Sequence, residues 1–171
     1  RGSLLARANF SAAIAGPYLL KVGDAAACGS SSGGINNKNC NVDVSISEIT
    51  LDCAGVAAAW GGLLVEDTMD VNVGPAILVV GFSGVGISLS GSGAGFIHEA
   101  WLGQYPPGSK TPRDDATATA ILLDSHEHDC DVNNVIVWSG KVGVNSTNGA
   151  NRLQGVHTWN LAGTKGGTGI R

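Results

Sequence analysis

Residues 119–160 decide the fold: TAILLDSHEHDCDVNNVIVWSGKVGVNSTNGANRLQGVHTWN. Short aliphatic and β-branched runs alternate here with Asn, Gly and Asp, at a spacing too tight for helices. Strands are predicted at 120–123, 135–138 and 142–144, each followed by a small polar turn. In a fourth strand, 152–157, apolar and polar residues alternate. The stretch therefore indicates an all-β protein built from the stacked coils of a parallel β-helix.

Similar short strands occupy the chain before this stretch. In the first of them apolar residues alternate with polar ones from Val42 to Ser47, which puts the apolar set on one face. The predicted strands are 42–51, 62–66, 69–73, 76–80, 85–89 and 95–98.

A row of small residues reveals the repeat. A small residue followed by aliphatic positions recurs with spacings of 24, 34, 23 and 26 residues, at Gly62, Gly86, Ala120, Gly143 and Gly169. One coil therefore takes about 20–30 residues. The longer coil contains an insertion at 104–115 with three prolines. Long loops on a solenoid hang from one face, which is often the ligand-binding face.

The composition narrows the classes of function. Glycine makes up 26 of 171 residues, about double the usual ~7%, and it lacks a collagen period. The net charge is −4, and basic runs with interleaved aromatic residues are missing, which argues against nucleic acid as a partner. No run approaches the ~18 apolar residues of a membrane span.

The N-terminal segment is expected to cap the solenoid. Residues 1–27 are Ala-rich, with apolar residues spaced as in a short amphipathic helix, and 28–41 is a Gly, Ser and Asn-rich loop. We divide the chain into an N-terminal cap and loop, 1–41, and a parallel β-helix, 42–171. Because both ends look interrupted, we expect the β-helix to be part of a longer chain.

Cysteine usage favours an oxidising compartment. The even count allows two disulfides with three pairings, and the alternative is buried thiols in a reducing compartment. The candidates are Cys28, Cys40, Cys53 and Cys130. Sequons at Asn9 and Asn145 fit glycosylation of a protein that is secreted or displayed at the cell surface.

Several segments carry a family resemblance over about residues 60–171. They are 101–104 (WLGQ), 119–121 (TAI), 134–139 (NVIVWS), 143–144 (GV), 150–160 (ANRLQGVHTWN) and 166–170 (GGTGI). In order and spacing they resemble the pectin-lyase-like superfamily of right-handed parallel β-helices, closest to plant polygalacturonase-like proteins of the quartet type. The resemblance implies an extracellular fold that handles acidic polysaccharide, hydrolysed in active members by a pair of carboxylates.

The chain departs from the catalytic motifs of that family. Polygalacturonases use Asn-x-Asp, Asp-Asp, Gly-His-Gly and Arg-x-Lys on successive coils. In this chain the first two motifs are matched by residue type at 41–43 (NVD) and 114–115 (DD), but these segments lie 71 residues apart. The other two motifs do not occur. Catalysis therefore cannot be transferred from the family residue by residue.

The densest group of ionisable residues is 124–131, DSHEHDCD. In an extended run His126 and His128 point to the same side. Three interpretations stay open. The run can be a solvated turn between coils, a group of carboxylates close enough to raise the pKa of one of them for general acid catalysis, or a metal site with two imidazole ligands beside a carboxylate. For an enzyme, the assignment is Asp124, Asp129 or Asp115 as carboxylates and His126 or His128 as auxiliaries. Neither a metal site nor a cofactor is predicted.

Aromatic side chains are the candidates for sugar contacts, since an indole face suits the apolar face of a pyranose. Trp138 and Trp159 end similar strands 21 residues apart, so they should stack on neighbouring coils, either as substrate-binding residues or as packing residues in the core or at an edge. His98 and His157 each follow an aliphatic position, and we predict that both are partly buried and hydrogen-bonded.

These features predict a secreted, polysaccharide-associated β-helix protein. As an enzyme it would be a polygalacturonase-like glycoside hydrolase acting on pectin-like acidic glycans. The alternative is a non-catalytic structural or assembly module that packs against other subunits, either a stacking protein partner or further copies of itself.

Overall fold

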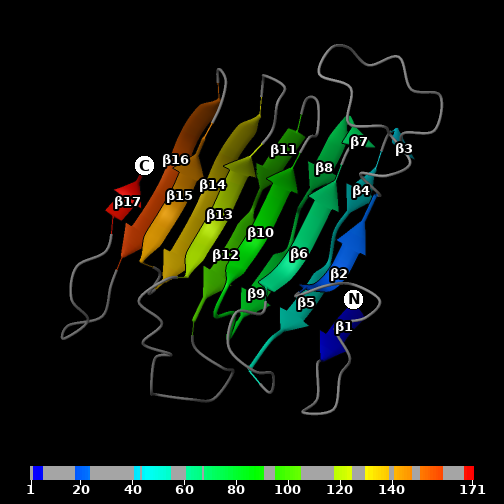
Figure 1. The fold of residues 1–171 in the computed structure, drawn as a ribbon, viewed down its shortest axis with the longest axis horizontal. Helices are drawn as coiled ribbons and strands as arrows, with labels where there is room; N and C mark the ends of the chain where they lie inside the picture. Colours follow the sequence, from blue (N-terminus) through cyan, green and yellow to red (C-terminus); the bar gives the residue numbers. More distant parts are fainter. Residues whose placement is uncertain are drawn as a thin grey trace.

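The computed structural model describes residues 2–5, 18–23, 41–42, 44–54, 61–66, 68–90, 95–104, 118–124, 130–138, 141–147, 151–159 and 168–171. These residues form 17 strands and no helix (Figure 1). Every strand pairing among them is parallel. The described part of the chain is therefore all-β with parallel sheets, as predicted.

The strands form two large sheets and one small one. Sheet A contains β1 (Gly2–Leu5), β4 (Ser45–Ile46), β5 (Ile49–Asp52), β8 (Val71–Val73), β9 (Ile77–Val80), β11 (Gly95–His98), β12 (Ala100–Gly103), β14 (Asp131–Trp138) and β16 (Arg152–Trp159). Sheet B contains β2 (Tyr18–Val22), β6 (Gly61–Glu66), β10 (Val85–Ser90), β13 (Thr119–Asp124), β15 (Val142–Ser146) and β17 (Thr168–Ile170). The third sheet pairs β3 (Asn41–Val42) with β7 (Thr68–Met69).

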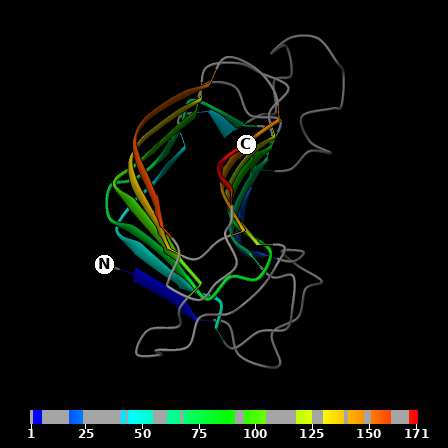
Figure 2. The ribbon, with the colours of Figure 1, turned by 90° about the vertical axis from the view of Figure 1, so that its left-hand side faces the viewer.

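The chain alternates between the two large sheets, and each return lands beside the previous strand. In sheet B the aligned positions are Leu63, Ile87, Ile121 and Val144. In Figure 2 the strands of each sheet lie behind one another, as two curved walls that face each other. This arrangement is compatible with a parallel β-helix.

The predicted row of small residues is confirmed. The strand register aligns all five of them, Gly62, Gly86, Ala120, Gly143 and Gly169, in adjacent strands of sheet B. A Cβ on Gly62 would lie 2.4 Å from Val79 Cγ1, and one on Gly143 would lie 2.4 Å from Thr158 Cγ2. The row is small because side chains of sheet A approach the backbone of sheet B there.

The core fills the space between the two sheets. Aliphatic side chains from both sheets are fully buried and touch one another as one cluster, which includes Leu51, Leu63, Val65, Val79, Ile87, Leu89, Ile97, Leu102, Ile121, Leu123, Val132 and Val137. Burial of such side chains supplies the main favourable free energy of folding.

A left-handed residue bends each coil of sheet A at the same place. These residues have φ between 50° and 62°, and they are Glu48, Ala76, Glu99, Asn134 and Gly155. Their backbones are linked across coils, with Glu99 N donating to Asn133 O at 3.2 Å and Ala76 N to Glu99 O at 3.1 Å. The bends split sheet A into a first half, before the bend, and a second half, after it. The single strand predicted at 42–51 is therefore wrong, because Glu48 interrupts it.

The N-terminal helix prediction is wrong at 2–5 and 18–22, which are strands β1 and β2. Strand β1 pairs with β5, and β2 pairs with β6 through Tyr18–Gly61 and Leu20–Leu63. Pairing with the next coil satisfies their backbone groups, and it buries Leu19 against the core. Residues 6–17 and 24–40 lie outside the described residues, so the cap and the division at residue 41 stay predictions.

Within the part of the chain that the structure describes, no helix has the length and apolar character needed to cross a membrane.

Candidate binding face on sheet A

The predicted catalytic residues are only partly placed by the structure. Asp124 ends β13 with an exposed side chain, and its Oδ1 accepts a hydrogen bond from Thr147 Oγ1 at 2.7 Å. Asp115, His126, His128 and Asp129 lie outside the described residues. The roles assigned to this group therefore stay predictions.

An aromatic pair stands on the outer face of sheet A, in its second half. The rings of Trp101 and Trp138 meet edge to face, with centroids 5.2 Å apart and planes at 88°. Trp138 and Trp159 are in register on neighbouring strands, as predicted from their spacing. For Trp159 the structure describes the backbone position only.

The local sequence explains why this pair faces outward. In β12 Ala100 and Leu102 are fully buried, so the intervening Trp101 points away from the core and is 48% exposed. Gly103 leaves room for its neighbour: a Cβ there would lie 2.9 Å from Trp138 Cε3. Trp138 can therefore lie close over the β12 backbone, beside Trp101.

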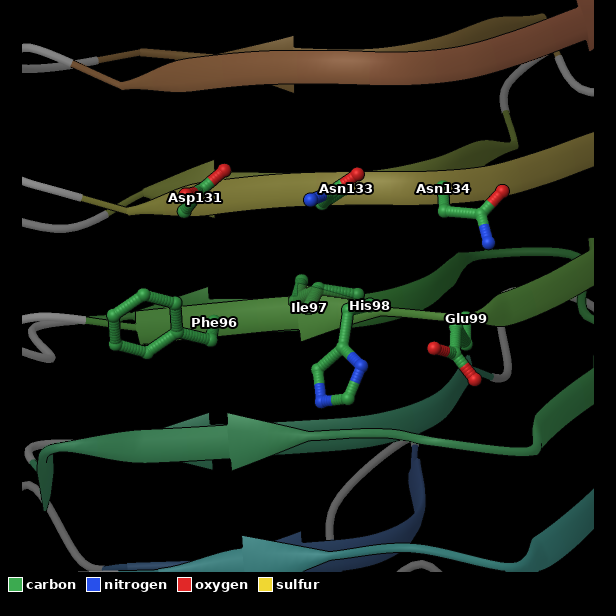
Figure 3. Close-up of a pocket in the computed structure, with 7 residues that line it drawn as sticks. All are labelled: Phe96, Ile97, His98, Glu99, Asp131, Asn133 and Asn134. Atoms are coloured by element: carbon green, nitrogen blue, oxygen red, sulfur yellow. The ribbon is translucent and has the colours of Figure 1, made fainter.

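The first half of sheet A carries a hollow of about 320 Å³ on the outer face (Figure 3). Strands β11 and β14, which pair through Phe96–Asp131 and His98–Asn133, supply its walls. The lining residues are Phe96, Ile97, His98, Glu99, Asp131, Asn133 and Asn134. Ile97 belongs to the core beneath, whereas the others supply an aromatic ring, two carboxylates, two amides and an imidazole.

His98 is held by a hydrogen bond between coils. Its side chain reaches from β11 toward β8, where Nε2 lies 2.9 Å from Asn72 Oδ1 (Figure 3). The prediction of a partly buried, hydrogen-bonded His98 is confirmed. The same prediction is wrong for His157, whose side chain is exposed, because strand alternation places it on the outer face in register with Ile136.

Among the described residues, Asp131 forms the only ion pair in the hollow. Arg152 on β16 directs both Nε, at 3.1 Å, and Nη2 to the same oxygen, Oδ2. The hydrogen bond from Arg152 raises the pKa of its guanidinium. Among the described residues nothing donates to the other oxygen, Oδ1, although it is buried. A buried acceptor without a donor is uncommon and calls for an explanation.

The outer face of sheet B carries a second polar group. Burial raises the pKa of the Tyr18 hydroxyl and the Glu66 carboxylate adds to the shift, while a hydrogen bond with Ser88 opposes it. Lys21 Nζ and Glu66 Oε2 form an ion pair at 2.7 Å. These side chains link β2 to β6 through Glu66 and to β10 through Ser88.

Two cysteines have described surroundings, and both are buried thiols. Cys53 Sγ donates to Gly61 O at 3.3 Å. Cys28 and Cys40 lie outside the described residues, so a disulfide between these two stays a prediction.

Of the two sequons, only Asn145 lies in the described part of the chain. It sits within β15 and is half-buried, and Thr147 of its sequon donates to Asp124 and to Leu123 O. Glycosylation at Asn9 and Asn145 stays a prediction.

Within the described ranges, no group of three or more His, Cys, Asp or Glu side chains lies close enough to hold a metal ion. The metal alternative for 124–131 concerns residues that lie mainly outside those ranges.

Comparison of the chain with protein-family models, curated proteins and solved structures found no match. The resemblance to quartet-type polygalacturonase-like proteins therefore remains a prediction. The outer face of sheet A, with its aromatic pair and its polar hollow, is the candidate binding face on structural grounds alone.

Proposed function

We propose that this chain is a right-handed parallel β-helix that binds a polysaccharide on the outer face of sheet A. The observation that carries the proposal is Trp101, a half-exposed indole that packs against Trp138 and lies next to the polar hollow between β11 and β14. The flat apolar face of an exposed indole matches the apolar face of a sugar ring.

The spacing of the two parts suits a chain-like ligand. Phe96 and Trp101 are five residues apart on β11 and β12, so their Cα atoms are at most about 16 Å apart along extended strands. One oligosaccharide can therefore stack on the indole and place neighbouring hydroxyls against the amides and carboxylates of the hollow. Polar groups with fixed positions beside an apolar wall are typical of ligand sites.

A binding assay with a matched control tests this function. Trp101→Ala and Ile170→Ala each remove an apolar side chain that is about half exposed, 48% and 54% respectively, but Ile170 lies on β17 of sheet B. By calorimetry with a panel of hexasaccharides, we expect Trp101→Ala to weaken binding on the order of 10–30-fold. Ile170→Ala should bind as the parent does.

The proposal fails if no glycan of the panel binds, or if both variants bind equally well. Unchanged circular dichroism of Trp101→Ala would show that a loss of binding is not a loss of folding.

Hydrolysis of the bound glycan and secretion of the protein remain predictions. The carboxylates assigned to hydrolysis are Asp115, Asp124 and Asp129, and Asp124→Asn should abolish any release of reducing ends from polygalacturonate. Equal activity of this variant and the parent would remove Asp124 from the mechanism.

An assembly module is the second candidate, favoured by the outermost described coil. Strands β16 and β17 each have one partner among the described strands, and Ile170 of β17 is 54% exposed. The outer edge of such a strand can pair with a further strand, of this chain or of another. If the chain is an assembly module, the parent protein should be an oligomer and Ile170→Asp should be a monomer, as measured by light scattering after gel filtration. A parent protein that is monomeric at high concentration would refute the assembly function.

A further inference from the structure

We infer that the hollow beside Trp101 selects glycans that carry amino groups over glycans that carry carboxylates. This inference rests on the proposed function, because it names the ligand class of the same binding face. It departs from the acidic glycan that the family resemblance implies.

Charge is the first step. Among the described residues on the strands and bends of sheet A, the carboxylates are Glu48, Asp52, Glu99 and Asp131, and the one basic side chain apart from histidine is Arg152. No lysine or arginine is among the residues that line the hollow. Like charges repel, so a uronate chain would meet the carboxylates of Glu99 and Asp131, and the one cation beside them, Arg152, is already paired with Asp131.

Hydrogen-bonding capacity is the second step. An ammonium group has three N–H donors and no acceptor, whereas a carboxylate group of a ligand has acceptors only. The lining offers the acceptor oxygens of Glu99, Asn133 and Asn134, all exposed, besides Asp131. A donor-rich cation therefore satisfies the lining, and a ligand carboxylate does not.

Asp131 explains how a ligand amine would enter. Its partner Arg152 binds through one carboxylate oxygen only, and the Arg152 side chain is 74% exposed. Arg152 can therefore leave the carboxylate to a competing cation without unpacking the core. Because the other oxygen, Oδ1, is buried, a ligand amine would bind at Oδ2, in place of the arginine.

Phe96 completes the site. Its ring is 47% exposed on the same side of β11 as the imidazole of His98 (Figure 3). An aromatic face attracts a cation and also packs on the apolar face of a sugar. An amino sugar combines both properties in one ring.

The test compares two hexasaccharides that share a backbone. Chitosan hexamer and cellohexaose are both β-1,4-linked glucose-type chains, and they differ in the amine or hydroxyl at position 2. At about pH 5.5, where a primary amine carries a proton, calorimetry at low salt should show chitosan hexamer binding on the order of tenfold more tightly. The preference should shrink as salt rises.

Variants assign the preference to the hollow. Glu99→Gln and Asp131→Asn should each reduce the ratio of the two affinities several-fold. Asp70→Asn is the matched control: it removes one exposed carboxylate outside the hollow, and asparagine tolerates the left-handed φ of 51° at that position. It should leave the ratio unchanged.

Failure of this inference is distinguishable from failure of the proposed function. If cellohexaose binds and chitosan hexamer binds no more tightly, or if a galacturonate hexamer binds best, the amine preference is refuted while glycan binding stands. An equally tight fully N-acetylated hexamer would refute it too, since that ligand carries no charge. If none of these ligands binds, the proposed function is refuted and the preference with it.

Discussion

Replacing Gly86 by alanine adds one carbon atom, Cβ, and so tests how closely the two sheets pack at that position. Gly86 belongs to the row of small residues on sheet B. An added Cβ would lie 2.7 Å from Ala120 O, 2.9 Å from Leu102 Cδ2 and 3.3 Å from Phe82 Cε1. The carbonyl belongs to the neighbouring strand, and both side chains are fully buried, so none of the three can move cheaply.

The expected loss of stability follows from these contacts. Overpacking a close-packed core costs about 1–3 kcal/mol. Replacing glycine by alanine also restricts the unfolded chain, which stabilises by about 0.4–1 kcal/mol. At the midpoints of these two ranges the net loss is about 1.3 kcal/mol. In urea this lowers the unfolding midpoint by roughly 0.5–1 M if the slope is about 2 kcal/mol/M.

The assay is urea unfolding followed by far-UV circular dichroism, with Gly103→Ala as the matched control. Gly103 is also a strand glycine, but a Cβ there meets the partly exposed indole of Trp138, which can turn aside. We expect this variant to lose less than about 1 kcal/mol. The reasoning is refuted if Gly86→Ala is as stable as the parent, because the small residues would then not be in close contact with sheet A.

Three further predictions concern other parts of the molecule. Asp124→Asn should change the free energy of unfolding by less than about 1 kcal/mol, because its bond from Thr147 is exposed; a larger loss in urea titration would contradict this. The raised pKa of Tyr18 in the folded protein means that stability is full below pH ~10 and falls as pH rises through the folded pKa. The difference in urea midpoint between pH 8 and about 10.5 should therefore be smaller for Tyr18→Phe than for the parent; equal differences would refute the assignment. Iodoacetamide should label the buried thiols of Cys53 and Cys130 only after denaturation, as peptide mass mapping would show, and rapid labelling of the native protein would contradict their burial.

The coil repeat could be predicted from the sequence because it rests on size and polarity. A small residue before aliphatic positions marks a place where another backbone or side chain comes close, and the register confirms all five members of that row. These rules act on neighbouring residues, so a single sequence contains them.

The bends of sheet A gave no comparable signal. Asparagine and glycine favour a left-handed φ, but Glu48, Ala76 and Glu99 do not. Their conformation is imposed by hydrogen bonds to the next coil, such as Ala76 N to Glu99 O. A bend that is stabilised by residues more than 20 positions away is invisible to local rules, and 42–51 was therefore predicted as one strand.

The hollow was missed for the same reason. Its walls come from 96–99 and 131–134, which a long coil separates in the sequence, and Arg152 comes from a third coil. The alternation in FIHE and DVNN predicts that Phe96 and His98 face one side and Asp131 and Asn133 face one side. Only the register, which pairs Phe96 with Asp131, shows that the two sets meet.

Adjacent rows in the first half of sheet A show why recognition should be local rather than repetitive. One inward row is aliphatic in every coil: Ile46, Val73, Ile97, Val132 and Leu153. The outward row beside it changes in every coil: Ser45, Asn72, Phe96, Asp131 and Arg152. The core restricts the first row to similar shapes, whereas solvent places no such restriction on the second. A surface for a periodic lattice would repeat the same outward residue from coil to coil, as the inward row does. Because the outward row instead places one aromatic ring, one paired carboxylate and one arginine on three successive coils, it suits a ligand that occupies a single place on the stack.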